Sequence, residues 1–215
     1  QWQKISRSSS YYELLFFAKW LIGCSGNISL MQTGMKPLKI EKPAEGEFNE
    51  YYAKYISLVP ETELVELLAS QAEDVKEVFD AFGDERENFA YAEGKWTVKE
   101  VFSHLIDGER HFAYRLHRIA RGDATPIEGF EQDGYIENSH AGQRTIGDLT
   151  AEFSELRSAN VRQLRVLDEA DWKRMGTASG FPVSACALGY IMAGHVRHHL
   201  GILRERYVAA GEDRK

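Results

Sequence analysis

The feature of this sequence that most restricts its fold is a helical repeat of apolar residues, which recurs in four segments from about residue 60 onward. In each segment apolar side chains follow one another at spacings of three and four, so a helix there would carry one apolar stripe. No convincing strand pattern accompanies them. Four amphipathic helices of roughly 20 to 27 residues favour an all-α four-helix bundle.

Each predicted helix has recognisable end signals. Thr97 and Glu100 have the spacing of a capping box, in which a hydroxyl and a carboxylate each satisfy a backbone N–H at the helix start. Thr145 and Asp148 form a weaker version of the same motif. The predicted helices extend from Leu64 to Phe82 with Gly83 as the stop, from Thr97 to about Gly122, from Thr145 to Leu167, and from a cap at Ser184 to about Ala210.

The connection between the second and third helices, residues 122–144, is unusually long for a compact domain. A connection of this length can carry the chain along the whole bundle, and the second and third helices can then run parallel. Long loops in compact domains are often functional. We therefore expect this crossover to contribute to a substrate pocket at the bundle mouth.

The rest of the chain divides into three predicted parts. We interpret residues 1–35 as an atypical leader that is non-native or disordered. The segment ending at Cys24 has the spelling of a lipoprotein box, but Glu13 and Lys19 in the apolar run argue against a signal peptide. Residues 36–59 are predicted to form an arm leading into the bundle over residues 60–210, and residues 211–215 a tail.

Composition excludes several classes of partner. The chain has 33 acidic and 26 basic residues and a formal net charge of −7, whereas binding to nucleic-acid phosphates needs a basic face. No apolar run reaches the length of about 18 residues that indicates a membrane span. Two cysteines, Cys24 and Cys186, cannot form a disulfide scaffold, so we expect a reducing, cytoplasmic location.

Two histidines on the apolar stripe of the fourth helix point to metal chemistry. His195 and His199 are one turn apart, so both imidazoles can approach one ion, while His198 lies on the flank. A single inward histidine is more often a hydrogen-bonded core residue. Two desolvated imidazoles side by side disfavour each other's protonation, and a shared metal ion explains the pair more simply.

A third ligand has to come from another helix. His104 lies beside the apolar stripe of the second helix and is flanked by core residues, whereas His111 is two turns further on and His117 lies elsewhere on the surface. Three neutral imidazoles leave a divalent ion its full charge and an open coordination position, as in catalytic zinc sites. The ligand set suits zinc or nickel, and ferrous iron is not excluded.

Two charged residues fall inside predicted apolar stripes. Glu109 lies on the core side of the second helix, and Arg157 on that of the third. One interpretation is a buried ion pair that fixes the helix register, because a lone buried charge is very unfavourable. The other makes Glu109 a catalytic general base near the metal. Side chains that could line a pocket mouth, or equally be solvated, are His111, Tyr114, Arg115, Tyr135 and His140.

Several short motifs, in this order and spacing, resemble the DinB/YfiT-like superfamily. The resemblance covers about residues 60–207. The motifs are Trp96–Leu105, Glu152–Arg157, Asp171-Trp172 with Arg174 and Gly176, and His195–His199.

That resemblance implies an up-down-down-up bundle in which His104, His195 and His199 bind a metal ion. It also implies a homodimer and a small-molecule substrate. Known members are mostly transferases or isomerases that use a low-molecular-weight thiol, or metal-dependent hydrolases.

We therefore expect a metal-dependent enzyme in which a divalent ion activates a thiol cosubstrate or water for transfer or hydrolysis. One alternative is a non-catalytic binding or dimerisation module in which the metal only joins two helices. A fourth protein ligand, such as His140, would favour that alternative, because structural zinc sites usually have four. A third hypothesis is a metal-free bundle.

Overall fold

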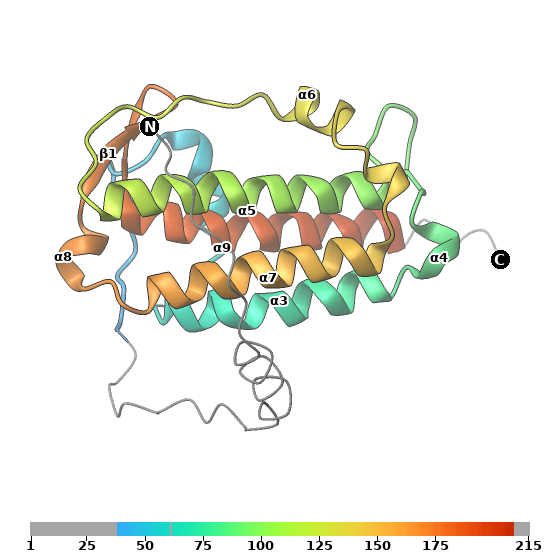
Figure 1. Cartoon of the computed structure of the whole chain (residues 1–215), viewed down its shortest axis with the longest axis horizontal. Helices are drawn as coiled ribbons and strands as arrows, with labels where there is room; N and C mark the ends of the chain where they lie inside the picture. The colour runs from blue at the N-terminus through green and yellow to red at the C-terminus, as the bar shows by residue number, and fades with distance from the viewer. Residues whose placement is uncertain (1–37, 61, 209–215) are drawn as a thin grey trace, which may run out of the picture. The chain divides into compact units, whose positions relative to one another are not determined.

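The structure is a computed structural model, and it describes residues 38–60 and 62–208 (Figure 1). The predicted leader over residues 1–35 and the tail over residues 211–215 therefore lie outside the described residues. None of the helices in the described part of the chain is long and apolar enough to cross a membrane.

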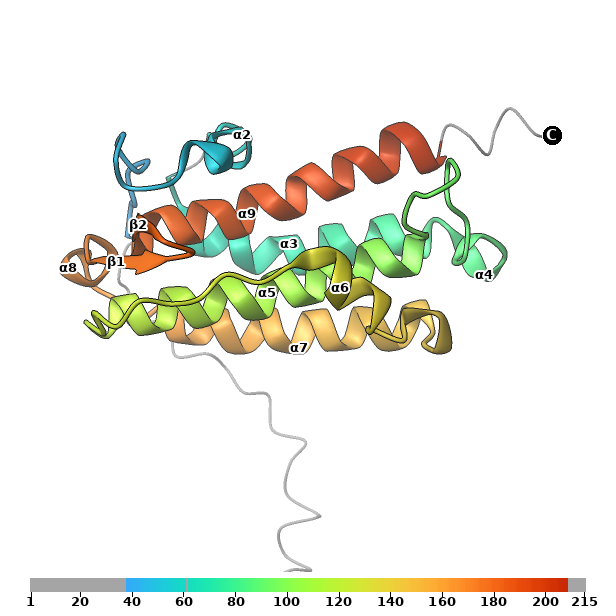
Figure 2. The ribbon, with the colours of Figure 1, turned by 90° about the horizontal axis from the view of Figure 1, so that it is seen from above.

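Four long helices form the bundle: α3 (Leu64–Asp80), α5 (Val98–Ala120), α7 (Ile146–Leu164) and α9 (Ala185–Ile202). Helix α5 packs against α7 and α9, and α3 packs against the same two helices from the other side. Helices α5 and α7 run in one direction and α3 and α9 in the other (Figures 1 and 2). The predicted all-α, up-down-down-up bundle is confirmed.

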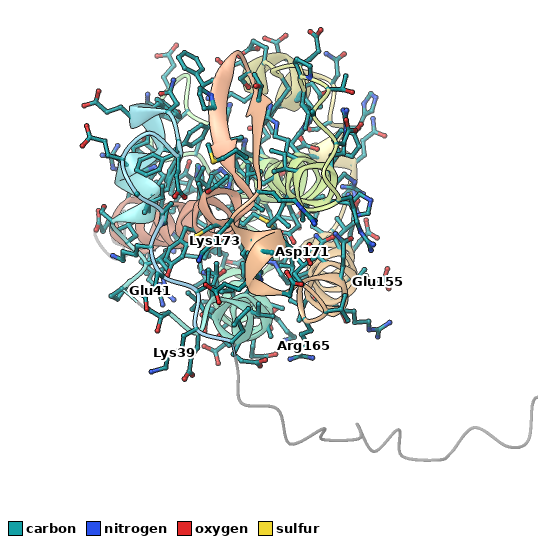
Figure 3. The ribbon with its side chains drawn as sticks, turned by 90° about the vertical axis from the view of Figure 1, so that its left-hand side faces the viewer. Lys39, Glu41, Glu155, Arg165, Asp171 and Lys173 are labelled. Carbon is teal, nitrogen blue, oxygen red and sulfur yellow. The ribbon has the colours of Figure 1, made fainter. Side chains whose placement is uncertain are left out.

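The bundle has the core that its apolar stripes predict. Apolar residues of all four helices are buried in its interior. Figure 3 views the molecule along the bundle, and Lys39, Glu155 and Arg165 are among the exposed charged side chains that it labels. The division between apolar stripe and charged face therefore decides which side of each helix is buried.

The predicted helix starts agree with the structure. The Thr97 hydroxyl accepts a hydrogen bond from the Glu100 backbone N–H, and the Glu100 carboxylate accepts one from the Thr97 N–H, so the capping box is complete. Thr145 and Ser184 cap α7 and α9 through their hydroxyls. Capping side chains satisfy backbone N–H groups that have no partner within the helix.

Two predicted helix ends are corrected. Helix α3 ends at Asp80, and Gly83 opens a short helix, α4 (Gly83–Arg86), instead of ending α3. Helix α9 changes at Leu203 into a π-helical segment, η3 (Leu203–Val208). The predicted end near Ala210 lies outside the described residues.

A β-hairpin contradicts the expectation that the chain has no strands. Strands β1 (Met175–Ala178) and β2 (Phe181–Ser184) pair antiparallel, and Ser179 and Gly180 between them have φ angles of 52° and 81°. Two positive φ angles are characteristic of a type I′ turn, whose twist matches that of the strands. Strands of four residues are too short for alternation to be detected in the sequence.

The remaining elements lie in the connections. Helix α2 packs on α9 (Figure 2), so the arm is part of the folded unit. The crossover between α5 and α7 runs back alongside α5, as its length predicted (Figure 1). These elements are η1 (Glu50–Tyr52), α2 (Ala53–Ile56), α6 (Gln132–Glu137), η2 (Ala141–Gln143) and α8 (Glu169–Trp172).

A buried polar network connects the four helices. Arg157 on α7 donates from Nε and Nη2 to the two carboxylate oxygens of Glu109 on α5, at 2.9 and 2.7 Å. Its Nη1 donates to Gln71 Oε1 and to the Leu68 carbonyl on α3, at 2.9 and 3.1 Å. Gln71 in turn donates to the Ala193 carbonyl on α9 at 2.9 Å. The network therefore fixes the relative position of all four helices.

This network predicts strong energetic coupling between Glu109 and Arg157. Arg157→Met or Glu109→Leu alone leaves a buried charge unpaired and should lower the free energy of unfolding by about 3 to 5 kcal/mol. The double variant should be less destabilised than the sum of the two changes. Urea unfolding of the four proteins measures the coupling energy.

An exposed ion pair provides the control. Arg165 and Glu66 are 3.1 Å apart, and their side chains are 42% and 49% exposed. The same cycle on this pair should give a coupling energy of at most about 1 kcal/mol. A coupling energy near zero for Glu109 and Arg157 would contradict their role as a structural pair.

Candidate metal centre

Three histidines from two helices meet inside the bundle. His104 lies on α5, and His195 and His199 lie one turn apart on α9. The ring centroids are 4.9 Å apart for His104 and His195, 4.7 Å for His104 and His199, and 4.6 Å for His195 and His199. Each ring offers one nitrogen within 4.8 Å of the other two. The structure therefore brings together the three histidines that the sequence singled out.

The geometry of these nitrogens fits a divalent cation. Nε2 of His104 and Nε2 of His195 face each other at 2.9 Å. Two nitrogens bound to one tetrahedral zinc ion would be about 3.3 Å apart, since each Zn–N bond is about 2.0–2.1 Å long. A small adjustment of the rings would therefore let both coordinate one ion. Three imidazole nitrogens are a ligand set that suits zinc or nickel.

The electrostatic environment keeps these imidazoles neutral. Burial lowers the pKa of His104 to about 4, with a smaller contribution from His198. Burial and the neighbouring imidazoles hold the pKa values of His195 and His199 well below their usual range. Neutral imidazole is the form that binds metal ions, so no proton has to be removed at neutral pH.

Gly108 on α5 makes room for the His195 ring. A Cβ atom at this position would lie 2.7 Å from Cε1 and 3.0 Å from Nδ1 of His195. Both distances are too short for a carbon atom to occupy the space, so any larger residue would displace the ring. Gly108 therefore positions the His195 ring in the candidate metal centre.

A second glycine lets the arm approach the site. A Cβ atom on Gly194 would lie 2.0 Å from the Tyr55 carbonyl oxygen, so α2 can rest on α9 only because residue 194 has no side chain. The Tyr55 ring then lies edge-on to His195, with centroids 5.5 Å apart. Phe112 is 5.4 Å from the His195 ring, and Trp96 is 4.9 Å from the His104 ring. Aromatic rings thus surround the imidazoles and restrict water near them.

A cavity of about 260 Å³ opens beside the histidines, and His104 and His195 line it. One wall comes from the arm and the opposite wall from the crossover. Glu131 is the acidic residue of this lining, and its carboxylate accepts hydrogen bonds from Gly134 and Asp133 at the start of α6, which lowers its pKa. The other lining residues are Tyr51, Tyr52, Tyr55, Gly108, Phe112, Phe130 and Gln132.

The other residues predicted to line a pocket lie outside this cavity. None of His111, Tyr114 and His140 lines this cavity. His111 stacks on Phe130 with centroids 3.8 Å apart and so supports the cavity wall from behind. Tyr114 is 54% exposed, and His140 is an exposed residue at the start of η2. His111 and Tyr114 lie on α5, whose helical period indicates which side is buried but not which residues border a cavity, and His140 lies on the crossover, which has no such period.

Glu109 belongs to the bundle interior and does not line the cavity. Both of its oxygens accept hydrogen bonds from Arg157, and Oε1 also accepts one from Asn160 at 2.7 Å. Its oxygens are occupied by these bonds and do not face the cavity, so Glu109 is not placed to take a proton from a group bound at the histidines. The structure therefore favours the ion-pair hypothesis over the general-base hypothesis.

Several site residues were not found from the sequence. The arm was predicted only as a connection, yet its tyrosines at positions 51, 52 and 55 cover the histidines. Their spacing of three and four was the available signal, but a helix of four residues is too short to show a stripe. Gly108 gave no signal, because nothing in the sequence indicates which ring it faces.

The fold and the three histidines define an all-α bundle protein with a candidate metal centre. The sequence profile of the DinB superfamily matches residues 67–203, which is more than half of the chain. The chain therefore belongs to the DinB superfamily.

Individual relatives have low sequence identity to this chain. A Geobacillus kaustophilus protein named "Putative metal-dependent hydrolase" is 25% identical over 130 residues, which cover 59% of this chain and 72% of that protein. The solved structure of YfiT from Bacillus subtilis, described as "a probable metal-dependent hydrolase with an unusual four-helix bundle topology", has a TM-score of 0.64 and 20% identity. The match covers 81% of this chain and 96% of YfiT.

A mycothiol-dependent maleylpyruvate isomerase is a second similar structure. It has a TM-score of 0.55 and 16% identity, and the match covers 68% of this chain and 61% of the isomerase. At these identities, the two solved structures show that the fold is shared.

The depressed histidine pKa values predict a pH dependence for the metal-free protein. Below the ordinary histidine pKa of about 6.5 the unfolded chain takes up protons that the folded chain does not accept. The free energy of unfolding should therefore fall as the pH is lowered from about 6.5 towards 4, where His104 itself begins to protonate.

Urea unfolding at a series of pH values measures this effect. A His104→Asn variant should show a weaker dependence between pH 7 and 5, a range that lies above most carboxylate titrations. If the wild type is equally stable at pH 7 and 5, the histidines are not neutral and desolvated as described.

A further prediction concerns Gly108. Gly108→Ala places a methyl group against the His195 ring, so the affinity for Zn²⁺ should fall at least about tenfold, the range found when groups that orient metal ligands are changed. Competition with a chromophoric chelator measures this affinity. Gly142→Ala is the control, because a Cβ at Gly142 would meet nothing within 4 Å; equal affinities for both variants would contradict the role of Gly108.

Proposed function

We propose that this protein is a metal-dependent enzyme in which His104, His195 and His199 hold one divalent ion that activates a low-molecular-weight thiol or water. The observation that carries the proposal is the convergence of three buried or half-buried imidazoles beside an open cavity. A divalent ion there would lower the pKa of a bound thiol or water and make it a nucleophile near neutral pH.

The number of protein ligands supports an enzyme over a structural clamp. Among the described residues, no fourth histidine, cysteine or carboxylate joins the cluster. His140, the candidate fourth ligand, is an exposed residue of the crossover. Structural zinc sites usually have four protein ligands, whereas catalytic sites have three and an open position.

The residues around the cavity have distinct roles in this proposal. The tyrosines of the arm and Phe112 limit water access, which strengthens electrostatic interactions inside the cavity. Glu131 is ionised at neutral pH, as glutamate ordinarily is, and the backbone N–H groups that bind its carboxylate lower its pKa further. Its low pKa suits it to orient a donor group of the substrate and makes it a weak proton acceptor.

The names of the relatives agree with this class of activity. The Geobacillus protein and YfiT are both described as metal-dependent hydrolases, and the isomerase depends on mycothiol, a thiol. Thiol transfer and hydrolysis would use the same open coordination position. Which of the two reactions takes place would therefore depend on the substrate that the cavity accepts.

Metal binding is the first test. Protein purified without a histidine tag should contain about one divalent ion per chain, and His195→Ala should lose it because one of three ligands is removed. His198→Ala is the matched control, since His198 is on the same helix but outside the cluster. Elemental analysis measures the metal content. Equal loss from both variants would show that the ligand set is wrong.

Activity is the second test. Metal-loaded wild type should transfer a thiol to a generic electrophile, or hydrolyse a generic ester or amide, and His199→Ala should reduce the rate to background. A metal-loaded protein that is inactive in both screens, and whose ion has a fourth protein ligand by X-ray absorption spectroscopy, would establish the structural clamp instead.

A further inference from the structure

Three cationic side chains are buried in the part of the chain that the structure describes: Lys99, Arg115 and Arg157. Lys99 forms an ion pair with Glu87 at 2.6 Å, and Arg157 pairs with Glu109 at 2.7 Å. Arg115 is only 3% exposed, yet no carboxylate of the described residues lies within ion-pair distance of it. A buried charge without an opposite charge is unfavourable. Besides two hydrogen bonds, Arg115 has the Phe130 ring 6.0 Å from its Cζ, but neither neutralises its charge.

The hydrogen bonds of Arg115 occupy only part of its guanidinium. Nη2 donates to the Glu128 carbonyl in the crossover and to Ser179 Oγ in the hairpin turn, both at 3.0 Å. These bonds hold the guanidinium in place. Nε and Nη1 have no acceptor within the described residues, although a guanidinium has five N–H donors. These two nitrogens are not fully buried, so they retain access to open space.

Arg115 lines a cavity of about 190 Å³. Its polar lining consists of Arg115, Asn49, Ser179 and the two tyrosines Tyr51 and Tyr52. The remaining wall is apolar and comes from the hairpin and α9: Ala178, Phe181, Pro182, Val183, Leu188 and Ile191. One cation at an otherwise apolar cavity suits a ligand with one negative charge and an apolar body.

This cavity is next to the one beside the histidines, because Tyr51 and Tyr52 line both. The helix positions give the separation. Gly108 on α5 lies against His195 on α9, so these two residues are at the same height in the bundle. Arg115 is seven residues after Gly108, and Leu188, which lines the cavity of Arg115, is seven residues before His195 on the antiparallel α9. Seven residues of α-helix correspond to about 10 Å. A ligand of that length can reach from Arg115 to the histidines.

We propose that Arg115 binds the carboxylate of an organic monoanion whose apolar body lies along α5 and α9 and whose other end is at the three-histidine centre. The carboxylate belongs either to the substrate or to a thiol cosubstrate. The position of the distal end rests on the proposed function. The carboxylate site itself rests only on the burial and unused donors of Arg115. The carboxylate site and the proposed function can therefore be disproved independently.

The first experiment measures charge selectivity by NMR titration with 4-phenylbutyrate and its uncharged amide. Wild type should bind the acid at least about tenfold more tightly than the amide, which corresponds to about 1.4 kcal/mol. Arg115→Gln should bring the ratio near one, because the hydrogen-bond donors remain in part and the charge is lost. Arg121→Gln, which removes an exposed arginine at the end of the same helix, should keep the ratio.

A second pair of probes identifies the source of the carboxylate. Glutathione and its glycine ethyl ester differ by one carboxylate of a thiol cosubstrate. An Arg115-dependent preference for glutathione assigns the site to the thiol, and a preference for 4-phenylbutyrate assigns it to the substrate. Equal binding of acid and neutral form in both pairs would overturn the proposal. Equal weakening of acid and neutral form in Arg115→Gln would likewise show a purely structural role.

The third experiment determines the orientation of the acid bound to the wild type. With paramagnetic Co²⁺ at the centre, the phenyl protons of 4-phenylbutyrate should relax faster than the methylene protons next to the carboxylate. The reverse order would show that the carboxylate binds the metal instead of Arg115, and would overturn the proposal. The titration repeated on metal-free His195→Ala should keep the acid preference, which separates the carboxylate site from the metal centre.

Discussion

The buried guanidinium of Arg157 is the interaction on which the arrangement of this bundle depends. Through Glu109, Gln71 and the Ala193 carbonyl it connects α7 to α5, α3 and α9. Apolar stripes alone allow helices to slide or rotate with little change in buried area. A hydrogen-bonded network with fixed geometry removes that freedom. Because Ala193 lies two residues before His195, the same network sets the level at which the histidines meet.

The three-histidine cluster also depends on two positions that have no side chain. Gly108 leaves the space that the His195 ring fills, and Gly194 leaves the space against which the Tyr55 backbone rests. The first contact sets the position of the His195 ring, and the second brings the Tyr55 ring against it. The arm and the crossover, which have little regular structure, thereby become the walls of a cavity whose floor is formed by two helices.

Buried cations have different roles along α5. Lys99 pairs with Glu87 and also donates to the Gly142 carbonyl in η2, so it attaches the crossover. Arg115, about four turns further on, also attaches the crossover but has no carboxylate partner among the described residues. The first is complete within the fold. Arg115 still has N–H donors without an acceptor. This difference distinguishes Lys99, a structural charge, from Arg115, a candidate binding group.

The sequence alone determined the helical segments, their caps, the inward faces and the residue types available to a metal, because these follow from local spacing and from the burial preferences of side chains. His104, Glu109 and Arg157 could be placed on core faces in this way. The hairpin, the tyrosine cover, the direction of Arg115 and the space beside Gly108 could not. They arise from contacts between segments far apart in the chain, and only the tertiary structure decides which side chains then share a cavity.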